Sequence, residues 1–192
     1  MRSAVTSWIL FSACFFSFFQ NAPVAAEIVT ESVEYRDGDA TLKGYLAYDD
    51  AIEEKRPGVL VIHEWWGLND YPKLRARQLA EMGYVAFAAD MYGEGQVTTS
   101  REEAASLAGK VRGTPLMRSR AKAGYDVLAG HKLVDEKRIG AIGFCFGGSG
   151  VLELAYTGTD LAGVVPFHGS LPLPKDGEAE RVKGKILVLH ST

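Results

Sequence analysis

Residues 138–150 have the sequence RIGAIGFCFGGSG. They begin with a short apolar run that is typical of a buried strand. Cys145 follows between Gly143 and Gly147, and the apolar positions from Val151 onward have helical spacing. A strand, a sharp turn that carries a nucleophile, and a helix together form a nucleophile elbow. We therefore predict a strand–turn–helix unit with Cys145 at its turn.

The two glycines around Cys145 fit such an elbow for a steric reason. In a strained turn, a Cβ atom two residues before or after the nucleophile would collide with the neighbouring strand or helix. The alternative is a structural cysteine, because a Cys that follows a strand is often a small buried hydrophobe. A dinucleotide-binding loop is excluded by spacing, since its third glycine would have to stand at position 153, which is Glu153.

The first 26 residues have the pattern of a secretory signal peptide. Arg2 gives a short basic start, residues 8–19 are apolar and uncharged, and small residues stand at 24–26. The apolar run is short for a membrane span, which needs about 20 residues. We predict cleavage between Ala26 and Glu27, no stable membrane anchor afterwards, and an exported protein, either periplasmic or secreted.

The predicted mature chain, residues 27–192, is long enough for one domain with a sizeable core. Without Arg2 its charge is 20 basic minus 24 acidic residues, or −4, and no basic stripe occurs, so we expect no nucleic-acid partner. Of the two cysteines, Cys14 lies in the signal peptide, which leaves Cys145 alone. A lone cysteine in an exported protein cannot form an internal disulfide, which favours a reactive thiol.

Strand and helix patterns alternate after an N-terminal hairpin. Residues 31–35 and 41–48 predict antiparallel strands around Asp37-Gly38. Buried strands are predicted at 58–62, 84–89, 139–142, 162–167 and 185–189, with helices at 70–82, 101–110, 116–129 and after the elbow. This order predicts an α/β fold with a mostly parallel sheet and helices on both faces. Active sites of such sheets lie at the carboxyl ends of the strands.

The helix after residue 69 is predicted from its boundary residues and its apolar spacing. Asp70 can cap its first turn and Gly83 can end it. We expect Leu74, Leu79 and Met82 to form its buried face.

Residues 63–67, HEWWG, directly follow the predicted strand 58–62. From this position an α/β-hydrolase contributes one N–H group to its oxyanion hole. Ordinary loop polarity is the alternative for His63 and Glu64, although Glu64 stands in an otherwise apolar, aromatic loop. No second His follows at the spacing of H-E-x-x-H, so no zinc site is indicated, and we expect neither metal nor cofactor.

Two further strand ends carry polar or aromatic side chains. At 90–93 we interpret Asp90 as a turn residue and Tyr92 as a core or pocket-lining aromatic. At 166–170 His168 could line a pocket. His168 comes too early for the catalytic base, because in this fold the acid and then the histidine follow the nucleophile at later strands.

Three motifs together resemble the dienelactone hydrolase family of α/β-hydrolases: HEWWGL at 63–68, YVAFAADMY at 84–92 and GFCFGG at 143–148. The resemblance runs from about Val33 to the end of the chain and implies the α/β-hydrolase fold. It implies Cys145 as nucleophile and Glu64 as the group that accepts the thiol proton when substrate enters.

The same resemblance places the oxyanion hole at the backbone N–H groups of Trp65 and Phe146. Residues that could line the pocket are His63, Trp66, Tyr92 and His168. The chemistry agrees with these roles, because a thiol needs a base or a positive environment to ionise, and a helix N-terminus supplies partial positive charge. Each oxyanion donor is worth roughly 3 kcal/mol.

The sequence departs from the family pattern at two places. The family triad continues with an aspartate after the strand that is here 185–189, and then a histidine, whereas this sequence ends at 190–192. We therefore expect a fragment or a truncated form whose C-terminal part, with the triad Asp and His, is missing. The founding enzymes also hold a substrate carboxylate with an arginine near the strand end at 90–92. Residues 93–95 are GEG here, which does not support a dienelactone substrate.

Three functions remain open. The preferred one is hydrolysis of a small-molecule carboxylic ester or lactone through a Cys145 acyl-enzyme. The second is a non-catalytic α/β-hydrolase-fold protein that binds a ligand or partner. The third is a thioesterase or acyltransferase on the same fold. The sequence does not indicate an oligomeric state.

Overall fold

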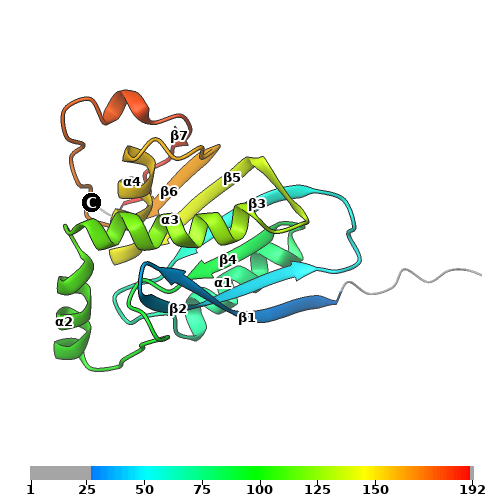
Figure 1. The fold of residues 1–192 in the computed structure, drawn as a ribbon, viewed down its shortest axis with the longest axis horizontal. Helices are drawn as coiled ribbons and strands as arrows, with labels where there is room; N and C mark the ends of the chain where they lie inside the picture. The colour runs from blue at the N-terminus through cyan, green and yellow to red at the C-terminus, as the bar shows by residue number, and fades with distance from the viewer. Residues whose placement is uncertain (1–26, 191–192) are drawn as a thin grey trace, which may run out of the picture.

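The computed structural model describes residues 27–190. The predicted signal peptide lies outside the described residues and stays a prediction. The described chain forms one sheet with helices on both sides (Figure 1). The elements in chain order are β1 (Ile28–Asp37), β2 (Ala40–Asp49), β3 (Arg56–Ile62), α1 (Asp70–Glu81), β4 (Val85–Ala89), α2 (Arg101–Val111), α3 (Pro115–Ala129), β5 (Val134–Phe144), α4 (Phe146–Tyr156), β6 (Gly163–Phe167), the 3₁₀ helix η1 (Ala179–Arg181) and β7 (Lys185–Ile186).

Seven strands form the sheet in the spatial order β1-β2-β4-β3-β5-β6-β7. β1 and β2 make an antiparallel hairpin, in which Asp37 pairs with Ala40 across a tight turn at Gly38, where φ is 59°. β2 is also antiparallel to β4, whereas β3–β4, β3–β5, β5–β6 and β6–β7 are parallel pairs. The predicted α/β class, a mostly parallel sheet with an antiparallel N-terminal hairpin, is confirmed.

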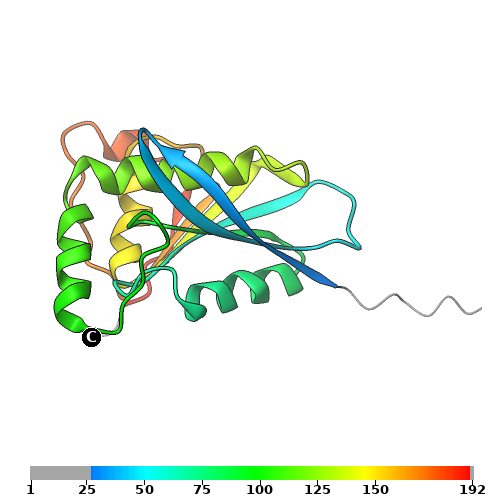
Figure 2. The same ribbon diagram turned by 60° about the horizontal axis from the view of Figure 1, so that its bottom comes forward.

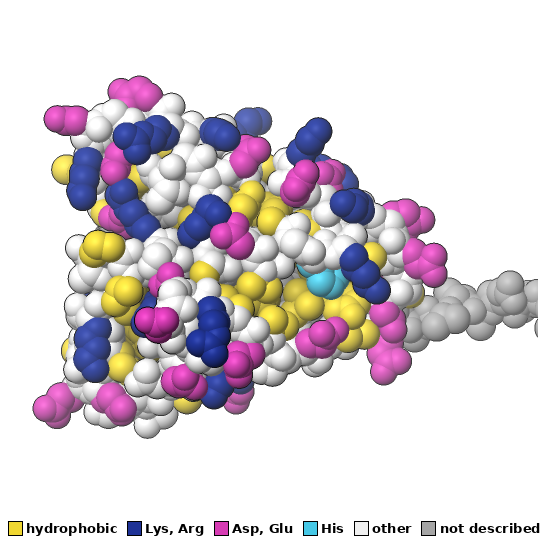
Figure 3. Space-filling view, in the orientation of Figure 1, with side chains coloured by type: hydrophobic (Ala, Val, Ile, Leu, Met, Phe, Trp, Pro, Cys, Tyr) yellow, Lys and Arg dark blue, Asp and Glu magenta, His cyan; other side chains and the backbone are white. Residues whose placement is uncertain are grey.

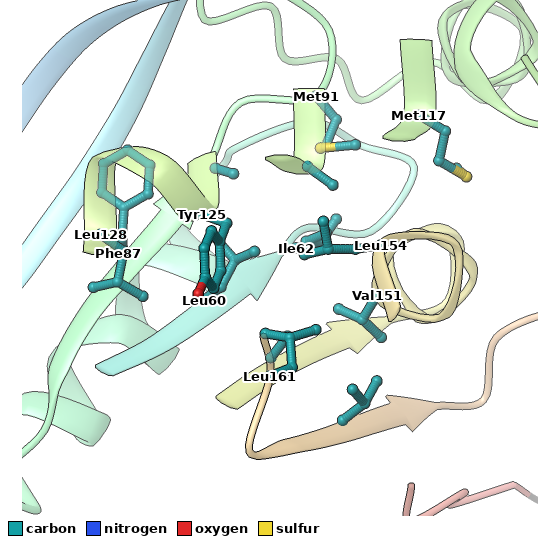
Figure 4. Packing of buried hydrophobic residues seen from close by; sticks show 14 of the residues in the cluster. Leu60, Ile62, Phe87, Met91, Met117, Tyr125, Leu128, Val151, Leu154 and Leu161 are labelled. Carbon is teal, nitrogen blue, oxygen red and sulfur yellow. The ribbon is translucent and has the colours of Figure 1, made fainter. Parts of the chain in front are cut away.

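The sheet separates two apolar layers, because successive residues of a strand face opposite sides. Leu60 and Ile62 of β3 belong to the layer under α3 and α4, while Val61 between them belongs to the layer under α1. Figure 4 shows Tyr125 of α3 and Leu154 of α4 among the side chains of the first layer. Figure 2 shows α1 on the opposite side of the sheet from α3. Burial on both faces explains why the central strands are continuous apolar runs.

Helix α1 differs from its prediction in cap and in buried face. Asn69 is the N-cap, and its side chain accepts a hydrogen bond from the Tyr71 N–H. The buried residues are Pro72, Ala76 and Ala80, whereas the expected core residues Leu74 and Met82 are 41% and 70% exposed. The expectation for Leu74 and Met82 was wrong because the facing strands carry alanines, Ala47, Ala86 and Ala88. Small residues on both surfaces let the helix and the sheet pack closely. Leu79, the third residue of the expected face, is partly buried against this layer.

The strand predicted at 185–189 is regular only over Lys185–Ile186. Its backbone nevertheless continues alongside β6, since Leu187 N–H donates to Val164 O (3.0 Å) and Leu189 N–H donates to Pro166 O (3.1 Å). The four apolar side chains at 186–189 are each at least 41% exposed. Within the described residues, this segment is therefore an edge of the sheet with one paired side.

Figure 3 shows the face of the molecule that carries α3, in the orientation of Figure 1. Basic and acidic side chains are interspersed over it, around a band of apolar side chains. This mixture agrees with the small formal net charge of −3 for the full sequence. No helix within residues 27–190 combines the length and the apolar character that crossing a bilayer requires.

Candidate active site

Cys145 lies between β5 and α4, where the sequence predicted a sharp turn. Its φ of 53° and ψ of −111° fall outside the regions that non-glycine residues normally occupy. Such a conformation costs roughly 1–3 kcal/mol and persists only where its surroundings fix it. Here Cys145 N–H donates to Phe167 O (2.9 Å), and Cys145 O accepts from Gly148 N–H (3.0 Å). The structure thus contains the predicted strand–turn–helix unit with Cys145 at its turn.

Two glycines allow the parts of this elbow to approach closely. A Cβ atom on Gly143 would lie 2.0 Å from Gly147 O, and one on Gly147 would lie 2.2 Å from Ile62 O. Both atoms met are backbone atoms, which cannot rotate away as a side chain can. The steric requirement expected from the sequence is present, and it also brings the start of α4 against the end of β3.

Glu64, Cys145 and His168 follow the carboxyl ends of three neighbouring strands and therefore lie at the same end of the sheet. Ile62 of β3 pairs with Gly143 of β5, so the loops that carry Glu64 and Cys145 start side by side. His168 follows β6, the other neighbour of β5, and its Nε2 lies 3.8 Å from Glu64 Oε1. The carboxyl ends of the parallel strands therefore converge on the candidate site.

Two backbone N–H groups beside this edge donate no hydrogen bond to an acceptor within residues 27–190. One belongs to Phe146, the first residue of α4, because N–H groups of a first helical turn lack an intrahelical acceptor. The other belongs to Trp65 in the loop after β3. The Cys145 thiol next to them is free and partly exposed. A partly exposed thiol beside unpaired N–H donors can attack a carbonyl and have the resulting oxyanion stabilised.

Asp90 at the end of β4 has the role of a turn residue, as interpreted from the sequence. Its Oδ1 accepts from the N–H groups of Tyr92 and Gly93 (2.9 Å each). Its Oδ2 accepts from the N–H groups of Lys43 (3.1 Å) and Gly95 (2.9 Å). Four backbone donors satisfy this fully buried carboxylate, so its function is to fix the loop after β4 against β2.

The residues expected to line a pocket lie at different depths. Trp66 borders a hollow of about 270 Å³, and His168 borders another of about 400 Å³ beside α1. Tyr92 is buried, and its hydroxyl donates to Trp65 O (2.9 Å). His63 has no exposed surface at all. Tyr92 also lines a smaller hollow of about 130 Å³ between α2 and α3. Three of the four residues therefore line hollows, while His63 is enclosed beneath the loop.

His63 is held at both ring nitrogens. Met91 N–H donates to Nε2 (3.1 Å), and Nδ1 makes a short hydrogen bond with Glu64 O. The ring meets Tyr92 edge-on, with centroids 4.9 Å apart, and stacks on Phe146 at 5.8 Å with an interplanar angle of 15°. Because burial disfavours the imidazolium cation, the pKa of His63 is lowered from 6.5 to about 4.

Acidification is expected to destabilise the fold through His63. Its unfolded pKa of 6.5 exceeds its folded pKa of about 4, so the unfolded state takes up the proton first as the pH falls. The stabilising effect is complete above pH 6.5 and is lost progressively toward pH 4, with a total of about 3 kcal/mol. Urea unfolding across this range measures it. His63→Asn should flatten the pH dependence, and a variant curve as steep as that of the wild type would contradict the assignment.

Comparison with known proteins adds to this geometry. Residues 42–192 match the family model described as "Dienelactone hydrolase family". The chain belongs to the dienelactone hydrolase family. The family and fold predicted from the three sequence motifs are thereby confirmed, and membership places the chain among the α/β-hydrolases.

Solved structures of dienelactone hydrolase-like proteins have the same fold. The structure named m3DLH has a TM-score of 0.82 and 38% sequence identity. A dienelactone hydrolase-like promiscuous phosphotriesterase from metagenomic libraries has a TM-score of 0.80 and 40% identity. Each similarity covers 85% of this chain and 68% of the other.

Curated relatives are similar over comparable lengths. Protein usf of Aquifex pyrophilus is 32% identical over 166 residues, which are 83% of this chain and 69% of the relative. A protein of Saccharolobus solfataricus, provisionally named carboxymethylenebutenolidase, is 28% identical over 84% of this chain and 74% of its own length.

The sequence reasoning on this dienelactone hydrolase family member missed Arg112. Arg112 is the C-cap of α2, and its guanidinium lies over the Phe146 ring, 5.8 Å from the centroid. It makes no ion pair with another residue in the range 27–190. Burial raises the pKa of Tyr92, and the charge of Arg112 opposes that rise. The only sequence signal was a cation directly before the break between two helices.

Proposed function

We propose that the protein hydrolyses carboxylic esters or lactones through an acyl-enzyme on Cys145. The observation that carries the proposal is the strained elbow, which presents a free, partly exposed thiol beside the unpaired N–H groups of Phe146 and Trp65. An elbow of this kind stores strain that a purely structural cysteine would not need. Membership of the dienelactone hydrolase family supports hydrolysis as the reaction class.

The proposed acylation uses these groups in one sequence of bonds. Cys145 Sγ attacks the substrate carbonyl carbon while its proton passes to the Glu64 carboxylate. The N–H groups of Trp65 and Phe146 bind the oxyanion of the tetrahedral intermediate. The C–O bond to the leaving group then breaks, and the alkoxide takes the proton back from Glu64 and leaves as the alcohol. Water afterwards attacks the thioester and releases the carboxylic acid and the thiol.

Arg112 favours acyl groups that carry a negative charge. Its guanidinium stands on the ring of Phe146, the residue that follows the nucleophile, and faces no carboxylate of the described chain. An anionic group on the acyl chain of a bound ester would meet this cation. Because Arg112 is exposed, the expected gain is modest, of the size of a surface ion pair.

Two aryl esters with the same leaving group test the proposal, 4-nitrophenyl acetate and the mono-4-nitrophenyl ester of succinic acid. We expect both to release a burst of nitrophenolate equimolar with the protein, and peptide mass mapping to find the acyl group on Cys145. At low ester concentration, the succinate ester should acylate the protein roughly three- to fivefold faster than the acetate ester does. Arg112→Gln should remove this preference, whereas Arg138→Gln, at the far end of β5, should keep it. Absence of a burst, or an acyl group on another residue, would refute the proposed reaction.

A further inference from the structure

The protonation of the His63 ring follows from its two neighbours. Met91 N–H is a donor and points at Nε2, so Nε2 has to be the unprotonated, accepting nitrogen. Nδ1 then carries the only ring proton of the neutral imidazole. The contact between Nδ1 and Glu64 O is therefore a hydrogen bond from the ring to the carbonyl. The burial of His63 keeps it in this neutral form at ordinary pH.

The carbonyl that His63 holds belongs to the peptide group between Glu64 and Trp65. In a trans peptide the C=O and N–H bonds point in opposite directions. A carbonyl drawn toward the buried ring therefore directs the Trp65 N–H away from it. Gly67 N–H donates to the same carbonyl at 3.3 Å, but this longer bond comes from within the same loop and does not tie the loop to the core.

The neighbouring peptide group is anchored as well, since the Tyr92 hydroxyl donates to Trp65 O at 2.9 Å. Both carbonyls on either side of the Trp65 nitrogen are thus held by buried side chains. The His63 ring also stacks on Phe146, whose N–H begins α4. One buried ring therefore contacts the peptide that bears the Trp65 N–H and the residue that bears the Phe146 N–H.

We infer that His63 is a positioning residue for the oxyanion hole. Its Nδ1–H orients the Glu64–Trp65 peptide, and its ring fixes that peptide relative to Phe146, so that both N–H donors face one oxygen. The inference rests on the proposed acyl transfer at Cys145. Because His63 is buried and acts through Trp65, it neither touches the substrate nor exchanges a proton with it.

Two reactions of the same thiol separate positioning from general structural support. Acylation by 4-nitrophenyl acetate passes through an oxyanion, so it depends on the N–H donors. Alkylation by iodoacetamide is a displacement at a saturated carbon and forms no oxyanion. A residue that positions the donors should change the first rate and leave the second unchanged.

Two substitutions distinguish the two nitrogens of His63. His63→Asn places an amide N–H₂ near the position of Nδ1 and keeps a donor for Glu64 O. His63→Gln places its amide near Nε2, keeps a partner for Met91 N–H and loses the donor to Glu64 O. Removal of one oxyanion donor slows acyl transfer by roughly 100- to 1000-fold, and misalignment should have part of this effect. We expect acylation to fall roughly ten- to hundredfold in His63→Gln and clearly less in His63→Asn, with equal alkylation rates in both variants and the wild type.

The matched control is the same pair of changes at His131. This residue precedes β5 and so lies at the opposite end of the strands, and its two variants should leave both rates unchanged. Equal acylation by the Asn and Gln variants of His63 would overturn the inference, as would a parallel fall of acylation and alkylation. Acylation by the wild type is measured first. A wild type that does not acylate refutes the proposed reaction itself, whereas an acylating wild type with unaffected His63 variants refutes only the role of His63.

Discussion

Replacement of Cys145 by alanine is expected to abolish acyl-enzyme formation altogether. The variant keeps the elbow and the two N–H donors but has no atom that can form a bond to the acyl carbon. Catalysis that remains after loss of a nucleophile comes only from the oxyanion hole and from binding, and it leaves no covalent intermediate. The nitrophenolate burst with an aryl ester and the mass of the intact protein after mixing both report this loss.

Ser149→Ala provides the control for Cys145→Ala. Ser149 is a buried hydroxyl in the same helix, and it donates to Ser170 O (2.8 Å). Its loss should cost about 1 kcal/mol of stability and leave the burst intact. A burst of undiminished amplitude in Cys145→Ala would show that another group is acylated and would refute the assignment of the nucleophile.

Gly143→Ala is expected to have the largest effect on the fold. Its new Cβ would lie 2.0 Å from Gly147 O, a backbone atom of α4 that cannot move without displacing the helix. The free energy of unfolding should fall by more than about 4 kcal/mol, as it does in severe core disruptions. A domain of this size would thereby lose much of its stability. Urea denaturation followed by circular dichroism measures the change, and an inability to fold is the extreme form of the same result.

Gly140→Ala on the same strand is the matched control. The nearest atom to its new Cβ would be Gly163 O at 3.5 Å, an ordinary van der Waals contact. We expect its free energy of unfolding to stay within about 1 kcal/mol of the wild type. If both variants unfolded at similar denaturant concentrations, close packing of the elbow would not be the reason why residue 143 has to be a glycine.

The elbow shows how the site and the fold depend on each other. Cys145 keeps a backbone conformation that is unfavourable by roughly 1–3 kcal/mol. The hydrogen bonds to Phe167 O and from Gly148 N–H oppose its relaxation, and the glycines make room for it. A change that relieves the strain is therefore expected to stabilise the turn and to misplace the thiol.

Several features of this protein were determined by the sequence alone, because their causes are local. The apolar runs at 58–62 and 139–142 predict buried parallel strands through their own composition. The strand–turn–helix at Cys145 follows from two glycines at fixed offsets. A Cβ atom on Gly143 would meet the backbone of Gly147, only four residues later, although the conflict at Gly147 is with Ile62 O of β3. The turn role of Asp90 was also predicted, and two of its four donors come from the next three residues.

Other features were decided only by the tertiary structure. The buried face of α1 depends on alanines contributed by β2 and β4, which no pattern within the helix reveals. Arg112 meets Phe146 only after α2 and α4 have been brought together. His63 follows a strand as a loop residue would, yet its partner Met91 stands 28 positions later in the chain. The Nδ1 atom of His63 finds its partner in the next residue, Glu64, but Nε2 depends on this distant N–H group, and only the folded chain brings that group to the buried ring.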